Sequence, residues 1–183
     1  MTGFDLSAAM IERAREKALA RGMDIRYECS DAATVELGET FEGAYSFFDS
    51  LNYITDPDNL QKAISRVAAH LRPGGSFIFD VNTAFAFEAK LFDQKELKAK
   101  APVRYDWKGD WDSASRLIHV NMKFWYEGEE YHETHVQRAY SDDEIRDMLA
   151  KAGFRDVKAF HSYTLNPPRH KSDRLHYMCL LGE

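Results

Sequence analysis

Apolar positions along the first 81 residues follow two different spacings. Residues 8–21 carry apolar side chains at helical spacing among charged ones, beginning after the helix-capping Ser7 and ending before Gly22. Other short runs are alternating or continuously apolar, as strands are. The predicted elements are strands at 3–6, 24–29, 43–48 and 76–81 and helices at 8–21 and 58–71. This alternation predicts an α/β fold with a parallel sheet.

The pattern changes after residue 81. We expect a helix at 84–100, then antiparallel strands at 103–111, 115–127 and 131–140, then a helix at 141–151 and closing strands at 157–163 and 175–181. Turns are predicted at Pro73-Gly74-Gly75, Gly109-Asp110 and Glu127-Gly128. Ser141 and Glu144 have the spacing of a capping box.

Length and charge narrow the class of protein. The chain has 183 residues, 44% of them hydrophobic, and a formal net charge of −6. These values suit one globular domain, residues 1–183, and argue against duplex DNA or anionic lipid as partners. No apolar run reaches the length of a membrane helix, and the start lacks a secretory pattern. With only Cys29 and Cys179, a disulfide framework is excluded, and we predict a cytoplasmic protein.

An acidic residue follows the first predicted strand. Asp5 lies in Gly3-Phe4-Asp5-Leu6-Ser7, directly before the first helix. In nucleotide-binding α/β units, an acid at such a strand end accepts hydrogen bonds from ribose hydroxyls. A carboxylate that only caps the next helix fits equally well from this segment alone.

Several blocks together resemble class I, Rossmann-like S-adenosylmethionine (SAM)-dependent methyltransferases. The blocks are Gly3-x-Asp5-x-Ser7-x-x-Met10, Asp31-Ala32, Phe41 to Tyr45 with Ser50-Leu51-Asn52-Tyr53, Leu71 to Asp80, and Ala152-Gly153-Phe154. The resemblance covers nearly the whole chain from the second strand of that fold. It implies a mostly parallel sheet with one closing antiparallel strand, and a helix plus antiparallel insert at 84–140 that covers the active site.

The resemblance also implies contacts with SAM. Asp5 holds the ribose, Leu6 and Met10 pack on the adenine or ribose, and Asp31 with Ala32 meets the adenine amino group. The residues alone allow other readings. Met10 fits core packing on an amphipathic helix, and Asp31 fits a turn carboxylate.

Candidates for the reacting end lie farther along the chain. By the resemblance, Phe47 and Phe48 are near the methionine part of SAM, although both also fit plain core filling. An oxygen or nitrogen nucleophile can require a general base, for which we name His132 and His135. Asp49 follows a strand end and is a candidate to contact the substrate, although helix capping also explains it. The two histidines lie three apart on a predicted strand and therefore face opposite ways, which argues against one shared metal, and we predict no metal site. Alternating strand polarity is the favoured explanation of both histidines.

The family's first strand and its Gly-rich loop are absent from these residues. Only four residues precede Asp5, and no G-x-G-x-x-G occurs elsewhere. We therefore expect N-terminal truncation; a strand supplied by a second chain, or closure of the two sheet edges on each other, are the alternatives. An unpaired edge favours homo-oligomerisation. We also expect weak SAM binding by these 183 residues.

The sequence thus predicts a SAM-dependent methyltransferase that transfers a methyl group to an oxygen or nitrogen atom of a small molecule. The alternative is a non-catalytic, methyltransferase-like interaction module. A nicotinamide-dependent oxidoreductase shares the ribose acid, but the blocks at Ser50 to Tyr53 and Ala152 to Phe154 weaken that reading.

Overall fold

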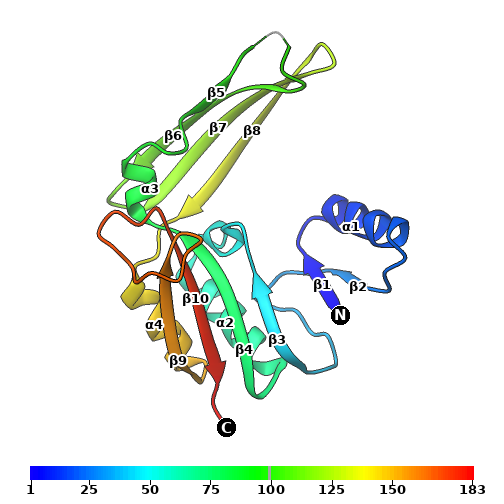
Figure 1. Ribbon diagram of the computed structural model, residues 1–183, viewed down its shortest axis with the longest axis vertical. Coiled ribbons are helices and arrows are strands. Elements are labelled where there is room, and N and C mark those ends of the chain that lie inside the picture. The colour runs from blue at the N-terminus through cyan, green and yellow to red at the C-terminus, as the bar shows by residue number, and fades with distance from the viewer. Residues whose placement is uncertain (99) are drawn as a thin grey trace.

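The computed structural model describes residues 1–98 and 100–183, arranged as three sheets (Figure 1). The helices are α1 (Ala8–Ala20), the 3-10 turn η1 (Ser50–Tyr53), α2 (Pro57–Ala69), α3 (Ala84–Glu88) and α4 (Asp142–Lys151). The strands are β1 (Thr2–Asp5), β2 (Arg26–Cys29), β3 (Phe41–Ser46), β4 (Leu71–Asn82), β5 (Gln94–Glu96), β6 (Arg104–Asp112), β7 (Leu117–Tyr126), β8 (Glu129–Arg138), β9 (Phe154–His161) and β10 (Arg174–Leu181).

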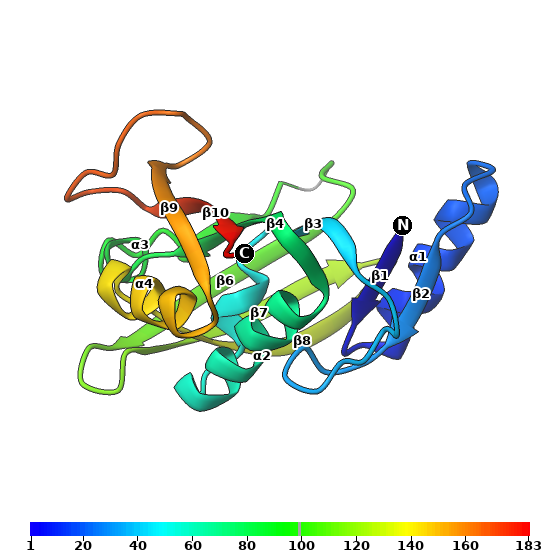
Figure 2. The same cartoon turned by 90° about the horizontal axis from the view of Figure 1, so that it is seen from below.

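The central sheet has the order β3-β4-β10-β9. Strand β3 is parallel to β4, and β10 runs antiparallel to both of its neighbours, β4 and β9. Helices α2 and α4 contact each other and cover one face of this sheet (Figure 2). Phe77, Phe79 and Tyr177 point from the sheet into this main core, where Leu60 and Leu149 meet them from the helices. The sheet is therefore Rossmann-like, with one antiparallel strand, as the resemblance implies.

The third sheet, β5-β6-β7-β8, is antiparallel throughout and rises from the carboxyl ends of β3 and β4 (Figure 1). It has a smaller core of its own, in which Phe87 from α3 meets Ile118 and Val120 from β7. Because side chains alternate along a strand, the sheet presents one mixed apolar and polar face to the central sheet and a charged face to the other side. We call this sheet, with α3, the insert.

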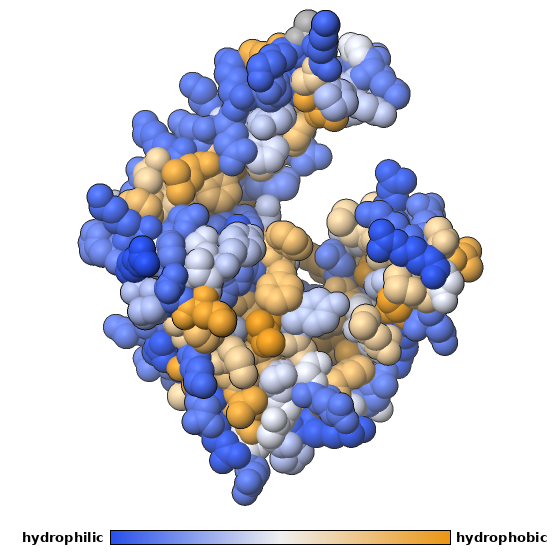
Figure 3. Space-filling view, viewed as in Figure 1, coloured by the Kyte–Doolittle hydropathy of each residue, from blue (hydrophilic) through white to orange (hydrophobic). Residues whose placement is uncertain are grey.

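Strands β1 and β2 form a separate parallel pair with α1. Among the described residues no ladder joins β1 to β3, so the two edges do not close on each other. Figure 3 shows the molecule deeply hollowed between this pair and the insert. In the described part of the chain, no helix is long and apolar enough to cross a membrane.

Three local predictions were wrong. The helix expected at 84–100 ends at Glu88, and β5 follows because it pairs with β6; residue 99 lies outside the described residues. Gly109 lies inside β6 rather than in a turn, where a Cβ would meet Ile118 Cδ1 at 2.8 Å. Residues 73–75 form a bulge within β4 instead of a separate turn: Gly74 has a φ of +76° and the register with β3 shifts there.

Candidate active site

The segment after β3 has an unusual backbone. Phe48 and Asp49 both adopt positive φ angles, +61° and +53°, which residues with side chains rarely do. The Asp49 amide is directed at the Asp80 carboxylate on the neighbouring strand β4, at 3.3 and 3.4 Å from its two oxygens. Two successive left-handed residues store strain that surrounding contacts must offset, and such strain is concentrated at functional sites.

Arg174, the first residue of β10, binds two carboxylates at this edge. Its Nη2 donates to Asp49 Oδ1 at 2.7 Å and its Nη1 donates to Asp80 Oδ2. Asp80 is only 1% exposed. Burial lowers the pKa of Arg174, but the two carboxylates outweigh it and raise the pKa above its ordinary value. The guanidinium therefore stays charged and joins β10 to the ends of β3 and β4.

Amide side chains extend this network to the insert. The Gln137 Nε2 on β8 donates to Asp49 Oδ2 at 2.6 Å, and its Oε1 accepts from Asn82 Nδ2 at 3.2 Å. Asn52, which is fully buried, donates to the carbonyls of Asn82 at 3.1 Å and Arg138 at 2.8 Å. Each of these amides has a fixed partner, so the insert is held to the sheet edge by directional bonds rather than by apolar packing alone.

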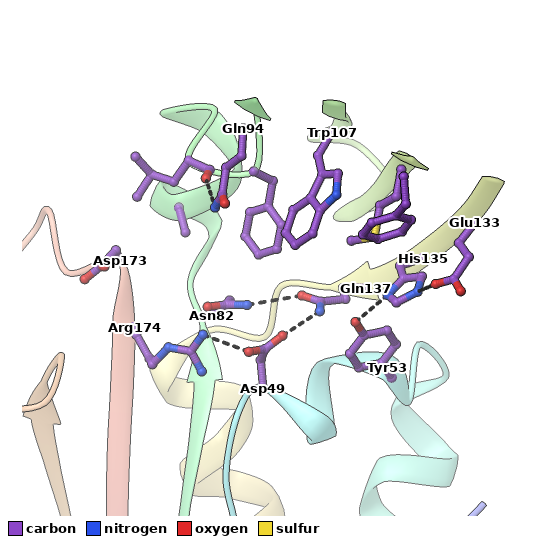
Figure 4. Close-up of a pocket in the computed structure, with 15 residues that line it drawn as sticks. Asp49, Tyr53, Asn82, Gln94, Trp107, Glu133, His135, Gln137, Asp173 and Arg174 are labelled. Atoms are coloured by element: carbon purple, nitrogen blue, oxygen red, sulfur yellow. Dashed lines mark hydrogen bonds and ion pairs between the residues drawn. The ribbon is translucent and has the colours of Figure 1, made fainter. Parts of the chain in front are cut away.

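A chain of three titratable side chains runs across the gap between η1 and β8. Tyr53 Oη lies 2.8 Å from His135 Nδ1, and His135 Nε2 lies 3.0 Å from Glu133 Oε2 (Figure 4). Since a carboxylate only accepts, this order assigns the imidazole proton to Nε2 and leaves Nδ1 to accept from the Tyr53 hydroxyl. Burial raises the pKa of Tyr53, and the charges of Asp49 and Glu133 raise it further, so the phenol is neutral at pH 7.

These groups line a cavity of about 460 Å³ between the insert and the carboxyl ends of β3 and β4 (Figure 4). Its polar floor carries Asp49, Tyr53, Asn82, Gln137 and Arg174. The insert supplies apolar walls, chiefly Phe92, Trp107, Met122 and Phe124. The volume suits a small molecule, and the few converging polar groups are typical of a small-molecule site.

The three residues named as catalytic candidates do not lie together in the structure. His135 and Asp49 both line the cavity. His132 lies on the opposite face of β8, where its Nε2 is 2.6 Å from Glu130 Oε1, and it lines a different hollow. Sequence reasoning missed Tyr53 and Arg174 as site residues. Tyr53 stood in one of the recognised blocks, whereas no local signal marks Arg174, which meets its partner 125 positions away.

The predicted cofactor residues gather at the carboxyl ends of β1, β2 and β3, outside both cavities described above. Asp5 Oδ1 accepts from the Ser7 amide and Asp31 Oδ1 from the Ala33 amide, each at 2.8 Å. Both carboxylates thus make the local turn contacts of the alternative reading, and each keeps an oxygen without a hydrogen bond to any described residue.

The apolar members of the predicted cofactor set are open to solvent. Leu6 is 73% exposed, Met10 60% and Phe48 77%, and Phe47 is also exposed. Neither core cluster contains them. Core packing therefore does not explain Met10, Phe47 or Phe48. Ala32, beside Asp31, lies in the turn after β2 and is half-buried.

Comparisons with known proteins agree with this architecture. Residues 1–75 match the family described as "Methyltransferase domain". A curated protein of Geobacillus sp. (strain WCH70), which carries a provisional methyltransferase name, is 25% identical over 183 residues, covering 97% of this chain and 74% of the relative. A solved SAM-dependent methyltransferase from Clostridium acetobutylicum ATCC 824 is 26% identical with a TM-score of 0.90, covering the whole chain and 75% of that protein.

A more distant structure shares the fold. The SAM-bound amino pentose methyltransferase from Micromonospora echinaspora is 18% identical, with a TM-score of 0.74, covering 98% of this chain and 72% of that one. The chain thus spans about three quarters of the length of these relatives. The motif blocks, the sheet with its single antiparallel strand, and these matches together support one reading: the chain is similar in sequence and in fold to the class I, Rossmann-like SAM-dependent methyltransferases.

Proposed function

We propose that this protein transfers the methyl group of SAM to an oxygen or nitrogen atom of a small molecule held in the cavity beneath the insert. The observation that carries the proposal is the Tyr53–His135–Glu133 chain, which opens onto that cavity. A hydroxyl or ammonium acceptor must lose a proton around the time of transfer, and a hydrogen-bonded relay next to the acceptor provides a destination for it.

The residues present fit SAM. Adenine and the methionine chain need apolar surface, and Leu6, Met10, Phe47 and Phe48 leave such surface uncovered at the carboxyl ends of β1 and β3. The ribose and the adenine amino group need acceptors, and the carboxylates of Asp5 and Asp31 each keep a free oxygen. When bound, SAM supplies a methyl group on a positively charged sulfur that is a good leaving group.

The chain's own residues then have three tasks. The network around Asp49, Asp80 and Arg174 fixes the cavity floor against which the acceptor lies. A fixed floor aligns the acceptor, and alignment dominates the rate of an in-line displacement. The insert walls exclude water from the acceptor. Tyr53 takes the acceptor's proton while passing its own to His135 Nδ1, and Glu133 stabilises the resulting imidazolium.

The test measures methyl transfer by variants of the relay. The protein is incubated with millimolar SAM and a panel of small amines, phenols and alcohols, and demethylated cofactor is quantified. For any accepted substrate, Tyr53→Phe and His135→Gln should lower kcat about 100-fold and change KM little, because they remove proton transfer and leave the walls intact.

His132→Gln is the matched control. It makes the same substitution on the opposite face of β8, so kcat should stay within about twofold of the unmodified protein. Equal losses in the His132 and His135 variants contradict the relay. If no acceptor in the panel is methylated at saturating SAM, the non-catalytic interaction module becomes the better reading.

A further inference from the structure

Negative charge dominates the cavity. Three carboxylates line it, Asp49 at the end of β3, Glu133 on β8 and Asp173 just before β10, and Asp80 lies directly behind. Among the described residues that line the cavity there is no lysine, and Arg174 is the only arginine. Both terminal nitrogens of Arg174 are already bound, to Asp49 and Asp80. The electric field in the cavity therefore favours a cation.

Asp173 is the least committed of these carboxylates. Its backbone carbonyl accepts from the Thr83 amide at 3.0 Å, but its side chain has no hydrogen bond or ion pair with any residue that the structure describes. It nevertheless lines the cavity and is only partly exposed. A half-buried carboxylate without a partner gains most from a cation brought by a ligand.

The aromatic walls of the cavity complement its negative charge. Trp107 and Phe124, whose rings are 5.8 Å apart in a T-shaped contact, and Phe92 line the insert side of the cavity, opposite the floor that carries Asp49. Aromatic faces attract cations and also bind rings and apolar chains. A ligand with an ammonium group at one end and an apolar body at the other matches both sides.

Within the proposed function, on which this step rests, we infer that the methyl acceptor is a small amine with an apolar or cyclic body, bound as its ammonium form and methylated on nitrogen. The ammonium lies toward Asp49, Glu133 and Asp173, and the body lies against the aromatic walls. A neutral alcohol or phenol leaves the surplus negative charge uncompensated and binds less tightly.

The ammonium loses one proton to Tyr53 Oη as the tyrosine proton moves to His135 Nδ1, leaving a neutral amine and an imidazolium paired with Glu133. The amine lone pair then forms the nitrogen–carbon bond while the carbon–sulfur bond breaks and its electrons go to sulfur. The product is an N-methylammonium ion, whose charge the same carboxylates accommodate. The raised pKa of Tyr53, due first to burial and then to Asp49 and Glu133, reports the same negative field.

The test compares two probes of the same skeleton, 2-phenylethylamine and 2-phenylethanol. Their dissociation constants are measured by NMR titration at pH 7 and low salt, where an alkylamine is protonated. The amine should bind at least about tenfold more tightly. Asp173→Asn and Glu133→Gln should each weaken amine binding about fivefold and change alcohol binding less than about twofold. Asp147→Asn on the exposed side of α4 removes the same charge away from the cavity and should change neither.

Methyl transfer to each probe at saturating SAM, read by mass spectrometry, separates the two proposals. Charge-dependent amine preference together with an N-methylated product supports the inference. Equal binding of both probes, or amine binding insensitive to Asp173→Asn and Glu133→Gln, overturns it; if the alcohol is then methylated, the proposed function stands. Transfer to no amine overturns the inference, and transfer to no amine, phenol or alcohol of the panel overturns both proposals.

Discussion

At the scale of single residues, the site depends on one guanidinium. Arg174 pairs with both Asp49 and the buried Asp80, and the Asp80 carboxylate also accepts from the Asp49 amide. The strained left-handed backbone at Phe48 and Asp49 is held in place by these bonds. Loss of a single partner therefore affects both stability and the shape of the cavity floor.

Asp80→Asn should show this directly. The change keeps the shape of the side chain but leaves Arg174 with one buried partner fewer, so the free energy of unfolding should fall by about 3 kcal/mol. Urea denaturation measures the fall. Glu42→Gln, which breaks the exposed pair with Arg72, should cost less than about 1 kcal/mol. Equal effects of the two substitutions would contradict a structural role for the buried pair.

Individual residues also show how far the sequence predicts the site. His135 was predicted as a base because imidazole is a usual group for that role, and Asp49 was predicted to contact the substrate because it follows a strand end; both line the cavity. His132 has the same chemistry, and only the register of β8 decides which histidine faces inward. No local pattern marks Arg174, which meets its partner 125 positions away. Tyr53 stood in a recognised block, but its partner His135 lies 82 positions away, so the block did not indicate its role.

At the scale of elements, the sequence correctly predicted features whose hydrogen bonds or backbone angles depend on residues close together in the chain. Helix α4 begins with the predicted capping box: the Ser141 side chain accepts from the Glu144 amide, and the Ser141 amide donates to Glu144 Oε2. The predicted turn at Glu127-Gly128 joins β7 to β8, and both residues have positive φ. Signals failed at 84–100, where pairing of β5 with β6 outweighs helix propensity.

The capping box makes the free energy of unfolding depend on pH in the acidic range. Burial acts to raise the pKa of Glu144, but hydrogen bonds from Ser141 and the charge of Arg116 outweigh it, so the pKa lies below the ordinary 4.5. A lowered carboxyl pKa contributes stability above about pH 4.5 that is lost as pH falls through the folded-state value. The free energy of unfolding should therefore decline less steeply in acid for Glu144→Gln than for the unmodified protein, as urea titrations between pH 3 and pH 7 would reveal. Identical slopes would contradict this assignment.

At the scale of the whole molecule, the β1–α1–β2 pair stands apart from the main core. Its buried side chains Ile11 and Ala18 belong to neither core cluster. The segment after β2 joins it to α2, where the Leu37 amide donates to His70 Nε2 at 2.9 Å and Arg66 Nε to the Val35 carbonyl at 2.8 Å. Homo-oligomerisation through its open edge and a cytoplasmic location stay predictions from the sequence.

Hydrogen exchange should be faster in the β1–α1–β2 pair than in the central sheet. Amides of β1, α1 and β2 should exchange at least tenfold faster than those of β4 and β10, because fewer apolar contacts protect them. Millimolar SAM should slow exchange at residues 5–10, 31–32 and 47–48 and leave β9 unchanged. Calorimetry on the 183-residue chain should give a dissociation constant weaker than micromolar, and tight binding contradicts that expectation. Protection confined to other segments contradicts the assignment of the cofactor-binding residues.

The position of β10 between β4 and β9 has a consequence for biosynthesis. The other strands of the central sheet, β3, β4 and β9, are all synthesised before β10. The edges of β4 and β9 that pair with β10 therefore stay unpaired while residues 162–173 are being added. Arg174 arrives with that same strand. The nascent chain thus carries unpaired strand edges, with Asp49 and Asp80 lacking their arginine, until β10 docks, and chaperones have most to protect in that interval.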